Sequence, residues 1–121
     1  MAHSFRVACA SILALVAIST AAVAESCDLF GKIKSLNSKK PVTITFVNRT
    51  DQSRIVMWLD FEGAPKEYAR LQPGEKTTIK TFVTHPWMFT DEPGNCHEIY
   101  QPKAKDKKFR ITVERQDLGP E

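Results

Sequence analysis

Two kinds of side chain in this sequence are suited to chemistry: cysteine thiols and a threonine–histidine pair. Cys27 and Cys96 are the two cysteines that follow residue 24, and His97 stands next to the second. In an oxidising compartment two such thiols predict one disulfide, which would close a loop worth about 4 kcal/mol in the chain-entropy model. A metal held by Cys96 and His97 is the alternative, but two adjacent ligands do not make a tetrahedral site.

Thr81 and His85 have the residue types of a nucleophile and its base. Nothing obvious in the sequence orients the imidazole, which a working pair requires. The chain also contains no Gly-x-Ser-x-Gly elbow, no His-Glu-x-x-His and no glycine-rich phosphate loop. The sequence therefore predicts a protein that is not an enzyme, with no catalytic residue, no metal and no cofactor.

Composition limits the architecture that can hold these residues. A chain of 121 residues is long enough for one ordinary domain and too short for two. Its 42% hydrophobic and 26% charged residues are typical of a packed globular protein. A formal net charge of +3 is too small to imply a nucleic-acid partner.

Residues 1–24 have the pattern of a secretory signal peptide. Met1 to Arg6 contains one cation, Val7 to Ala17 is almost wholly apolar, and Ala22-Val23-Ala24 is a small-x-small cleavage site. The apolar run is shorter than the ~20 residues of a spanning helix, although an uncleaved anchor remains the alternative interpretation. We therefore expect residues 25–121 to form the mature domain, secreted or periplasmic, with no stable membrane span.

Alternation of apolar and polar residues dominates the mature chain, with turn residues about every 8–12 positions. This pattern predicts an all-β fold, an antiparallel β-sandwich of six or seven short strands, preceded by a short helix or coil over residues 28–36. The apolar residues expected to alternate into the core are Val42, Ile44, Phe46, Ile55, Met57, Leu59, Phe61, Ala69, Leu71, Phe109, Ile111 and Val113.

The same alternation predicts two aromatic side chains on solvent faces. If Met57 and Leu59 face the core, Trp58 faces away from it, and Tyr68 faces away when Ala69 faces in. Large exposed aromatic side chains indicate a binding surface. A covering loop, or cross-strand pairing that stiffens the sheet, would account for them equally well.

Two further segments allow more than one interpretation. Asn48-Arg49-Thr50 fits the N-glycosylation pattern, which matters only in a eukaryotic secretory route. Lys103 to Lys108 is a basic connector that is either a solvated turn or a contact for an acidic polymer or lipid headgroups.

Five short runs keep a constant spacing over about sixty residues between Ile33 and Asp91. They are Lys34-Ser35-Leu36-Asn37-Ser38, Phe46-Val47-Asn48-Arg49-Thr50, Trp58-Leu59-Asp60-Phe61-Glu62-Gly63, Leu71-Gln72-Pro73-Gly74 and His85-Pro86-Trp87-Met88-Phe89. Together they resemble the von Hippel–Lindau (VHL) β-domain family, with a weaker match continuing to Val113. The Thr84–Trp87 and Gly94–Cys96 runs look like the secreted, stand-alone members of that family.

The resemblance implies a seven-stranded β-sandwich and a pocket that captures a 4-hydroxyproline side chain. By position, the aromatic walls would be Trp58, Tyr68 and Trp87. Thr81 would replace a serine, and His85 would be the histidine, that together bond the ligand hydroxyl. Asn37 and two other positions would contact the bound peptide nearby, and at those two positions this chain carries Lys80 and Phe82. The two replacements argue against recognition of the same peptide sequence.

The resemblance covers recognition and not ubiquitin ligation, which in that family requires a further helical domain to recruit an elongin adaptor. The sequence ends at Glu121, within ten residues of its last predicted strand, so neither ligase activity nor an elongin adaptor is expected. We expect an exported binding module for a peptide or protein segment, with a proline- or hydroxyproline-like side chain in its pocket. The alternative is a structural or stability protein of the cell envelope that has no small-ligand pocket.

Overall fold

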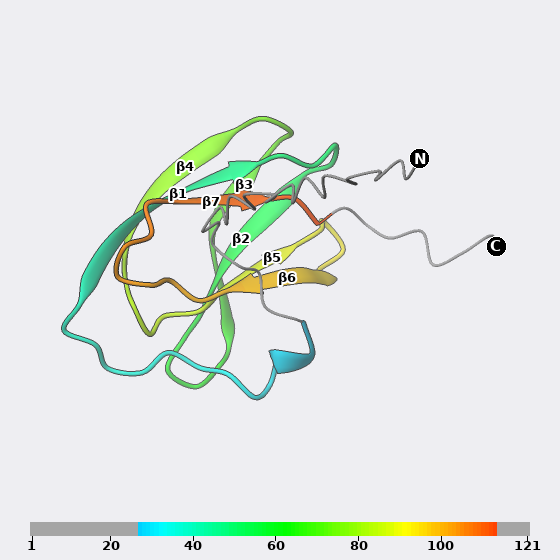
Figure 1. The fold of residues 1–121 in the computed structure, drawn as a ribbon. Helices are drawn as coiled ribbons and strands as arrows, with labels where there is room; N and C mark the ends of the chain where they lie inside the picture. The colour runs from blue at the N-terminus through cyan, green and yellow to red at the C-terminus, as the bar shows by residue number, and fades with distance from the viewer. Residues whose placement is uncertain (1–26, 114–121) are drawn as a thin grey trace, which may run out of the picture.

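The computed structural model describes residues 27–113, so the predicted signal peptide at 1–24 lies outside the described residues. A 3-10 turn, η1 (Cys27–Leu29), precedes seven strands (Figure 1). These are β1 (Pro41–Asn48), β2 (Arg54–Leu59), β3 (Pro65–Leu71), β4 (Lys76–Phe82), β5 (Trp87–Thr90), β6 (Cys96–Tyr100) and β7 (Lys108–Ile111). The predicted all-β sandwich is confirmed. Within 27–113 there is no helix with the length and apolar character needed to cross a membrane.

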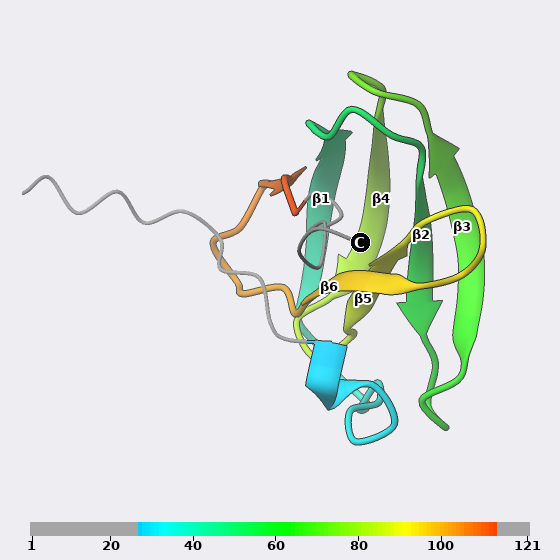
Figure 2. The ribbon, with the colours of Figure 1, turned by 90° about the vertical axis from the view of Figure 1, so that its right-hand side faces the viewer.

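The strands form two sheets, a three-stranded one in the order β4-β1-β7 and a four-stranded one in the order β3-β2-β5-β6. Figure 2 shows β1 and β4 in one layer and β2 and β3 in the other. The expectation of a purely antiparallel sandwich is wrong at one place, because β7 runs parallel to β1. The connector after β6 crosses to the other sheet, where the Thr45 N–H donates to the Lys107 carbonyl at 2.9 Å and β7 begins alongside.

The main core lies between the two sheets and is organised around Phe46 of β1. The Phe46 ring centroid lies 5.4 Å from those of Trp87 and Phe89, 6.1 Å from that of Tyr100 and 6.4 Å from that of Phe109. Tilted and edge-to-face ring contacts of this kind add to the free energy gained by burying the rings. The aromatic cluster therefore joins β1 and β7 of one sheet to β5 and β6 of the other.

A second apolar cluster covers the outer face of the four-stranded sheet. Its buried members are Leu59, Met88 and Ile99, and Leu29, Ile33, Met57 and Cys96 pack against them. Leu29 and Ile33 come from the segment before β1, which lies beside this sheet in Figure 2. The inner strands β2 and β5 are thus covered on both faces, which explains why all four residues of Trp87–Thr90 are buried, whereas the edge strand β3 is largely exposed.

This second cluster corrects the predicted faces of β2. Met57 and Leu59 point to the outer cluster, whereas Val56 and Trp58 belong to the core between the sheets. Alternation separates the two sets of side chains but does not say which set meets the other sheet. Phe61 was also expected in the core, yet it follows the end of β2 and is 47% exposed. Asp60 begins a turn there by accepting the N–H groups of Glu62 and Ala64 at 2.8 and 2.9 Å.

A disulfide holds the N-terminal segment against the sheet. Cys27 and Cys96 are bonded, with their Cα atoms 6.0 Å apart and a sequence separation of 69. The predicted disulfide is confirmed, and Cys96 is not available as the metal ligand of the alternative interpretation. The bond joins η1 to the first residue of β6, directly beside the outer cluster.

The Asn48 side chain has no room for a glycan. The Asn-x-Thr pattern at this site instead reflects the hydrogen bonds that Asn48 and Thr50 make within the fold. Asn48 is fully buried, and its Nδ2 donates to the carbonyls of Gln52 and Leu71, each at 2.8 Å. Its Oδ1 accepts the backbone N–H of Thr50 at 3.0 Å and the Thr50 hydroxyl at 2.7 Å. All the hydrogen-bonding capacity of this amide is used, and it ties the β1–β2 turn to the end of β3.

A carboxylate closes the turn between β5 and β6. Asp91 accepts the backbone N–H and the side-chain amide of Asn95, at 2.8 and 3.0 Å, and its Oδ2 lies 3.0 Å from His97 Nε2. Burial alone would raise the pKa of Asp91, but the hydrogen bonds from His97 and Asn95 outweigh burial and lower that pKa to about 2. The ionised carboxylate therefore stabilises the fold.

The outer cluster and the disulfide should be thermodynamically coupled. Leu59→Ala is expected to lower the free energy of unfolding by about 2–5 kcal/mol in the disulfide-bonded protein. In the Cys27→Ser/Cys96→Ser background the same substitution should lower the free energy of unfolding by at least about 1 kcal/mol less. The reason is that the effects of substitutions within one cluster are not additive. Val56→Ala, in the core between the sheets, is the matched control and should cost the same in both backgrounds. Equal costs for Leu59→Ala in the two backgrounds, measured in urea, would contradict this arrangement.

The Asp91 carboxylate should give stability that depends on pH. Its folded pKa of about 2 lies below its ordinary value of 3.8, so its contribution is present above that value and is lost as the pH falls towards 2. Asp91→Asn should therefore lower the free energy of unfolding by about 1–2 kcal/mol at neutral pH and by much less near pH 2. Asp51→Asn, at an exposed turn, is the control and should show little effect. A pH-independent cost for Asp91→Asn would refute the electrostatic explanation.

Candidate functional site

An aromatic cleft of about 320 Å³ opens where β3 and β4 form the edges of their sheets. Its volume is at the lower end of the range for small-molecule pockets, about 300–1,000 Å³, and suits one side chain with its flanking backbone. All five residues that the sequence assigned to a pocket converge on it. The lining consists of Trp58, Phe61, Tyr68, Lys80, Thr81, Phe82, His85 and Trp87.

Trp87 and Thr81 form the floor of the cleft. Trp87 is 2% exposed and lies in the core between the sheets, while Thr81 is 4% exposed and faces inward from β4. The indole Nε1–H of Trp87 donates to the Thr81 hydroxyl at 3.1 Å. The Thr81 oxygen is thus held in place as an acceptor, and its own O–H is free to donate to a molecule in the cleft.

Trp58 forms one wall, and its position is fixed by a residue that the sequence argument did not single out. The Trp58 Nε1–H donates to the Ser35 hydroxyl at 2.8 Å, and Ser35 in turn donates to the Leu59 carbonyl at 2.6 Å. Ser35 is 2% exposed, so this chain of hydrogen bonds is shielded from water. No pattern in the sequence distinguished Ser35 from an ordinary loop serine.

Tyr68 forms an adjoining wall because of a β-bulge. The pairing of β2 with β3 shifts register after Val56, which leaves Tyr68 without a partner while Ala69 is paired. A bulge turns a side chain away from the direction that strict alternation would give it. The Tyr68 ring therefore lies on the cleft side, 6.1 Å from the Trp58 ring and 5.0 Å from the Trp87 ring, centroid to centroid. The ring is still 53% exposed, so the predicted exposure holds while its predicted face is wrong.

His85 stands at the rim of the cleft, in the loop between β4 and β5. Its backbone N–H donates to the Phe82 carbonyl at 3.1 Å. Its ring centroid lies 5.6 Å from that of Trp58, 5.4 Å from that of Phe61 and 5.1 Å from that of Phe82. Burial lowers the pKa of His85 below 6.5, and hydrogen bonding to the Leu36 backbone only partly opposes this shift. The imidazole is therefore neutral at pH 7 and can accept or donate a hydrogen bond.

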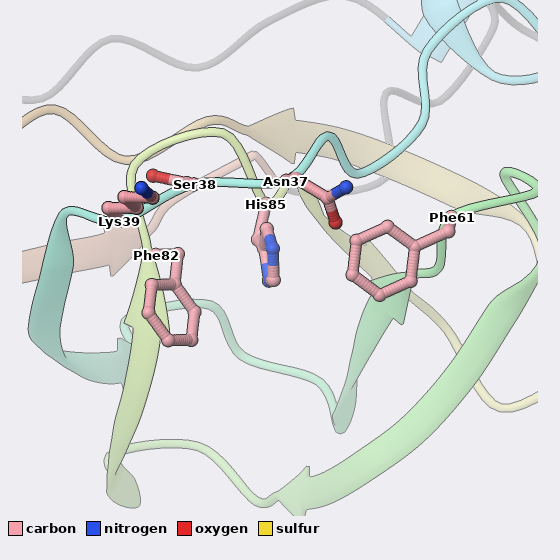
Figure 3. A pocket seen from close by; sticks show the side chains of 6 residues that line it. All are labelled: Asn37, Ser38, Lys39, Phe61, Phe82 and His85. Atoms are coloured by element: carbon pink, nitrogen blue, oxygen red, sulfur yellow. The ribbon is translucent and has the colours of Figure 1, made fainter.

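A second hollow, of about 260 Å³, adjoins the aromatic cleft and shares three of its residues. Figure 3 shows the His85 ring between the rings of Phe82 and Phe61, with Asn37 above them. The hollow is lined by Asn37, Ser38, Lys39, Phe61, Phe82 and His85. Asn37 thus lies beside the aromatic cleft and not inside it, and its contact with a bound peptide stays a prediction.

The arrangement can bind but has none of the contacts of a nucleophile and its base. No hydrogen bond links the Thr81 hydroxyl to His85 in the described part of the chain, and the Thr81 oxygen is engaged by Trp87 instead. Across residues 27–113 there is also no group of three or more His, Cys, Asp or Glu suited to a metal ion. Sequence reasoning missed Phe61 as a wall, although the turn-forming residue Asp60 just before it was a signal that the strand ends there.

Residues 33–106 match the family model described as VHL beta domain. The matched range covers more than half of the 121 residues and includes the whole aromatic cleft and Asn37. It also includes β1 to β6 and the Ser35 contact to Trp58. The chain therefore belongs to the VHL β-domain family.

Proposed function

We propose that this protein is an exported binding module that takes a peptide or protein segment, with a proline-like side chain of that segment in the aromatic cleft. Membership of a family whose β-domain is a binding domain supports this function. The observation that carries the proposal is the convergence of Trp58, Tyr68 and Trp87 with a hydroxyl and an imidazole on one small cleft. Ubiquitin ligation is not part of the proposed function.

The chemistry of the cleft fits a cyclic, partly apolar side chain. The aromatic walls would contact the saturated, puckered ring of a proline through apolar and CH–π interactions. A hydroxyl on that ring would reach the Thr81 O–H and the neutral His85, which together supply a donor and an acceptor. A site that bonds a buried hydroxyl discriminates against the ligand without it, because its own polar groups are then left unpaired. 4-Hydroxyproline is therefore the side chain that we propose for this cleft.

Export is proposed on the basis of the disulfide. A bond between Cys27 and Cys96 persists in oxidising compartments such as the periplasm or the cell exterior. The predicted signal peptide at residues 1–24 is consistent with such a location. In that compartment the partner would be an extracellular or envelope protein segment.

Thr81 and His85 should control selectivity of the cleft for the hydroxyl. His85→Ala is expected to weaken the binding of a hydroxyproline peptide by about 1–3 kcal/mol and to leave the binding of the matched proline peptide nearly unchanged. Tyr68→Ala should weaken both peptides alike, because ring contact does not depend on the hydroxyl. Tyr68 is preferred over Trp87 for this variant because Trp87 is buried in the core. Isothermal titration calorimetry with the two peptides measures these differences.

Phe30→Ala is the control for this experiment, because Phe30 is an aromatic residue of comparable exposure, 46%, that lines none of the described hollows. It should leave both affinities unchanged. If neither peptide binds the unmodified protein at millimolar concentration, the cleft is not a proline site. The envelope-structural interpretation would then take its place.

Affinity for the hydroxylated peptide should depend on pH through His85. Because burial lowers the pKa of His85 below 6.5, the acceptor form is maintained at pH 6.5 and above and is lost only in more acidic solution. Affinity should therefore be constant from mildly alkaline pH down to about 6.5 and then decline. The proline peptide and the His85→Ala variant should not show the decline. An affinity that increases in acid would mean that His85 acts as a charged donor.

A further inference from the structure

The outer face of the three-stranded sheet concentrates positive charge. Four cations, Lys76 and Lys80 on β4 and Lys108 and Arg110 on β7, are exposed. The buried residues of these strands alternate with them and face the core between the sheets. The sequences of β1, β4 and β7 contain no Asp or Glu. We call this surface the basic face.

Within residues 27–113 no carboxylate is paired with the charges of the basic face. The face carries +4, whereas the whole chain has a formal net charge of +3, so the remaining residues together carry −1. Like charges grouped on one sheet face repel each other and lower stability. Such a segregation of charge indicates a surface that meets a negatively charged partner.

The connector before β7 extends the same charge. Lys103, Lys105 and Lys107 are exposed. The acidic residue among them, Asp106, is engaged with Tyr100, whose hydroxyl donates to it at 2.6 Å. Asp106 also accepts the backbone N–H of Lys103 at 3.0 Å. The connector's carboxylate therefore stays with Tyr100 while its three lysines remain accessible.

Register places the cations in rows across the sheet, with hydroxyls between them. Lys76, Val47 and Arg110 lie opposite one another in one row, and Thr78, Thr45 and Lys108 lie opposite one another in the next. The hydroxyls of Thr45 and Thr78 are hydrogen-bonded to each other at 2.9 Å. Strand geometry separates Lys108 from Arg110, two residues apart, by about 7 Å, cations two strands apart by about 10 Å, and those four residues apart by about 13 Å. A set of charges spread over such distances matches a chain of repeated anions better than one compact anion.

We propose that the basic face binds a linear acidic polysaccharide. A polysaccharide supplies repeated carboxylate or sulfate groups for the cations and hydroxyl groups for the threonines between them. Lipid insertion needs exposed apolar side chains, and the apolar residue in the middle of this face, Val47, is only 7% exposed. Sequence-specific recognition of nucleic acids uses an element that enters a groove or aromatic stacking, whereas this face presents threonine hydroxyls between its cations. Duplex DNA is included as a probe because phosphates can bind lysine and arginine without such elements.

The experiment measures binding of the disulfide-bonded protein to heparin and to polygalacturonate at low salt, about 0.05 M. Neutral dextran, duplex DNA and vesicles of phosphatidylcholine with phosphatidylglycerol serve as comparison probes. Lys76→Glu/Arg110→Glu should weaken polysaccharide binding about tenfold or more, since each reversal turns an attraction into a repulsion. Lys80 is left unchanged because it also lines the aromatic cleft.

Lys32→Glu/Lys34→Glu is the matched control, because it changes the net charge equally at two exposed lysines before β1. This variant should keep at least half of the affinity, and Tyr68→Ala should keep all of it. Equal losses in the two charge variants would mean that binding follows net charge alone and would overturn the proposal. Binding to DNA or to vesicles that matches or exceeds binding to both polysaccharides would also overturn it, as would no binding to either polysaccharide. Circular dichroism confirms that each variant is folded.

Discussion

Leu59, Met88 and Ile99 form an apolar surface on the outside of the four-stranded sheet, and the segment before β1 excludes water from it. In a small domain the apolar area that can be buried is limited. Burial of this outer apolar surface therefore contributes a substantial part of the free energy of folding. A short segment with one 3-10 turn has little structure of its own to hold it there. The Cys27–Cys96 bond supplies the attachment, because it prevents the segment from leaving the sheet even when its apolar contacts open.

The same segment also builds the aromatic cleft. After Ile33 packs on the sheet, Ser35 holds the indole of Trp58, and Leu36 exchanges hydrogen bonds with Thr84 directly before His85. Asn37 then lines the adjoining hollow. The covering of the outer face and the geometry of the cleft are therefore parts of one structure. A change that loosens the segment is transmitted to Trp58 and to the His85 loop although it touches neither.

The sequence predicted the fold well and the site in part, for physical reasons. Alternation identified strands such as β1 and β7 because about one side chain in two is buried in them. It misassigned the faces of β2, since both faces of that strand are covered and parity cannot tell them apart. The predicted positions of Tyr68 and Phe61 were wrong for local reasons. A β-bulge, which has no clear signature in a single sequence, moves Tyr68, and a turn that Asp60 signals ends the strand before Phe61. The position of Ser35 depends on a contact across 23 residues that no local pattern encodes.

The order of the strands also decides when the protein can reach its native state. β1 lies between β4 and β7 in the three-stranded sheet. β1 is the first of the described strands to be synthesised, and it gains its second neighbour only when β7, the last of them, has been made. The disulfide likewise cannot form until Cys96, 69 residues after Cys27, has been synthesised. Closing such long loops is costly in entropy and slow, so little of this sandwich is stable before residue 111 has been made. Until then β1 lacks its second neighbour, and the unpaired backbone groups along that edge are open to pairing with other chains.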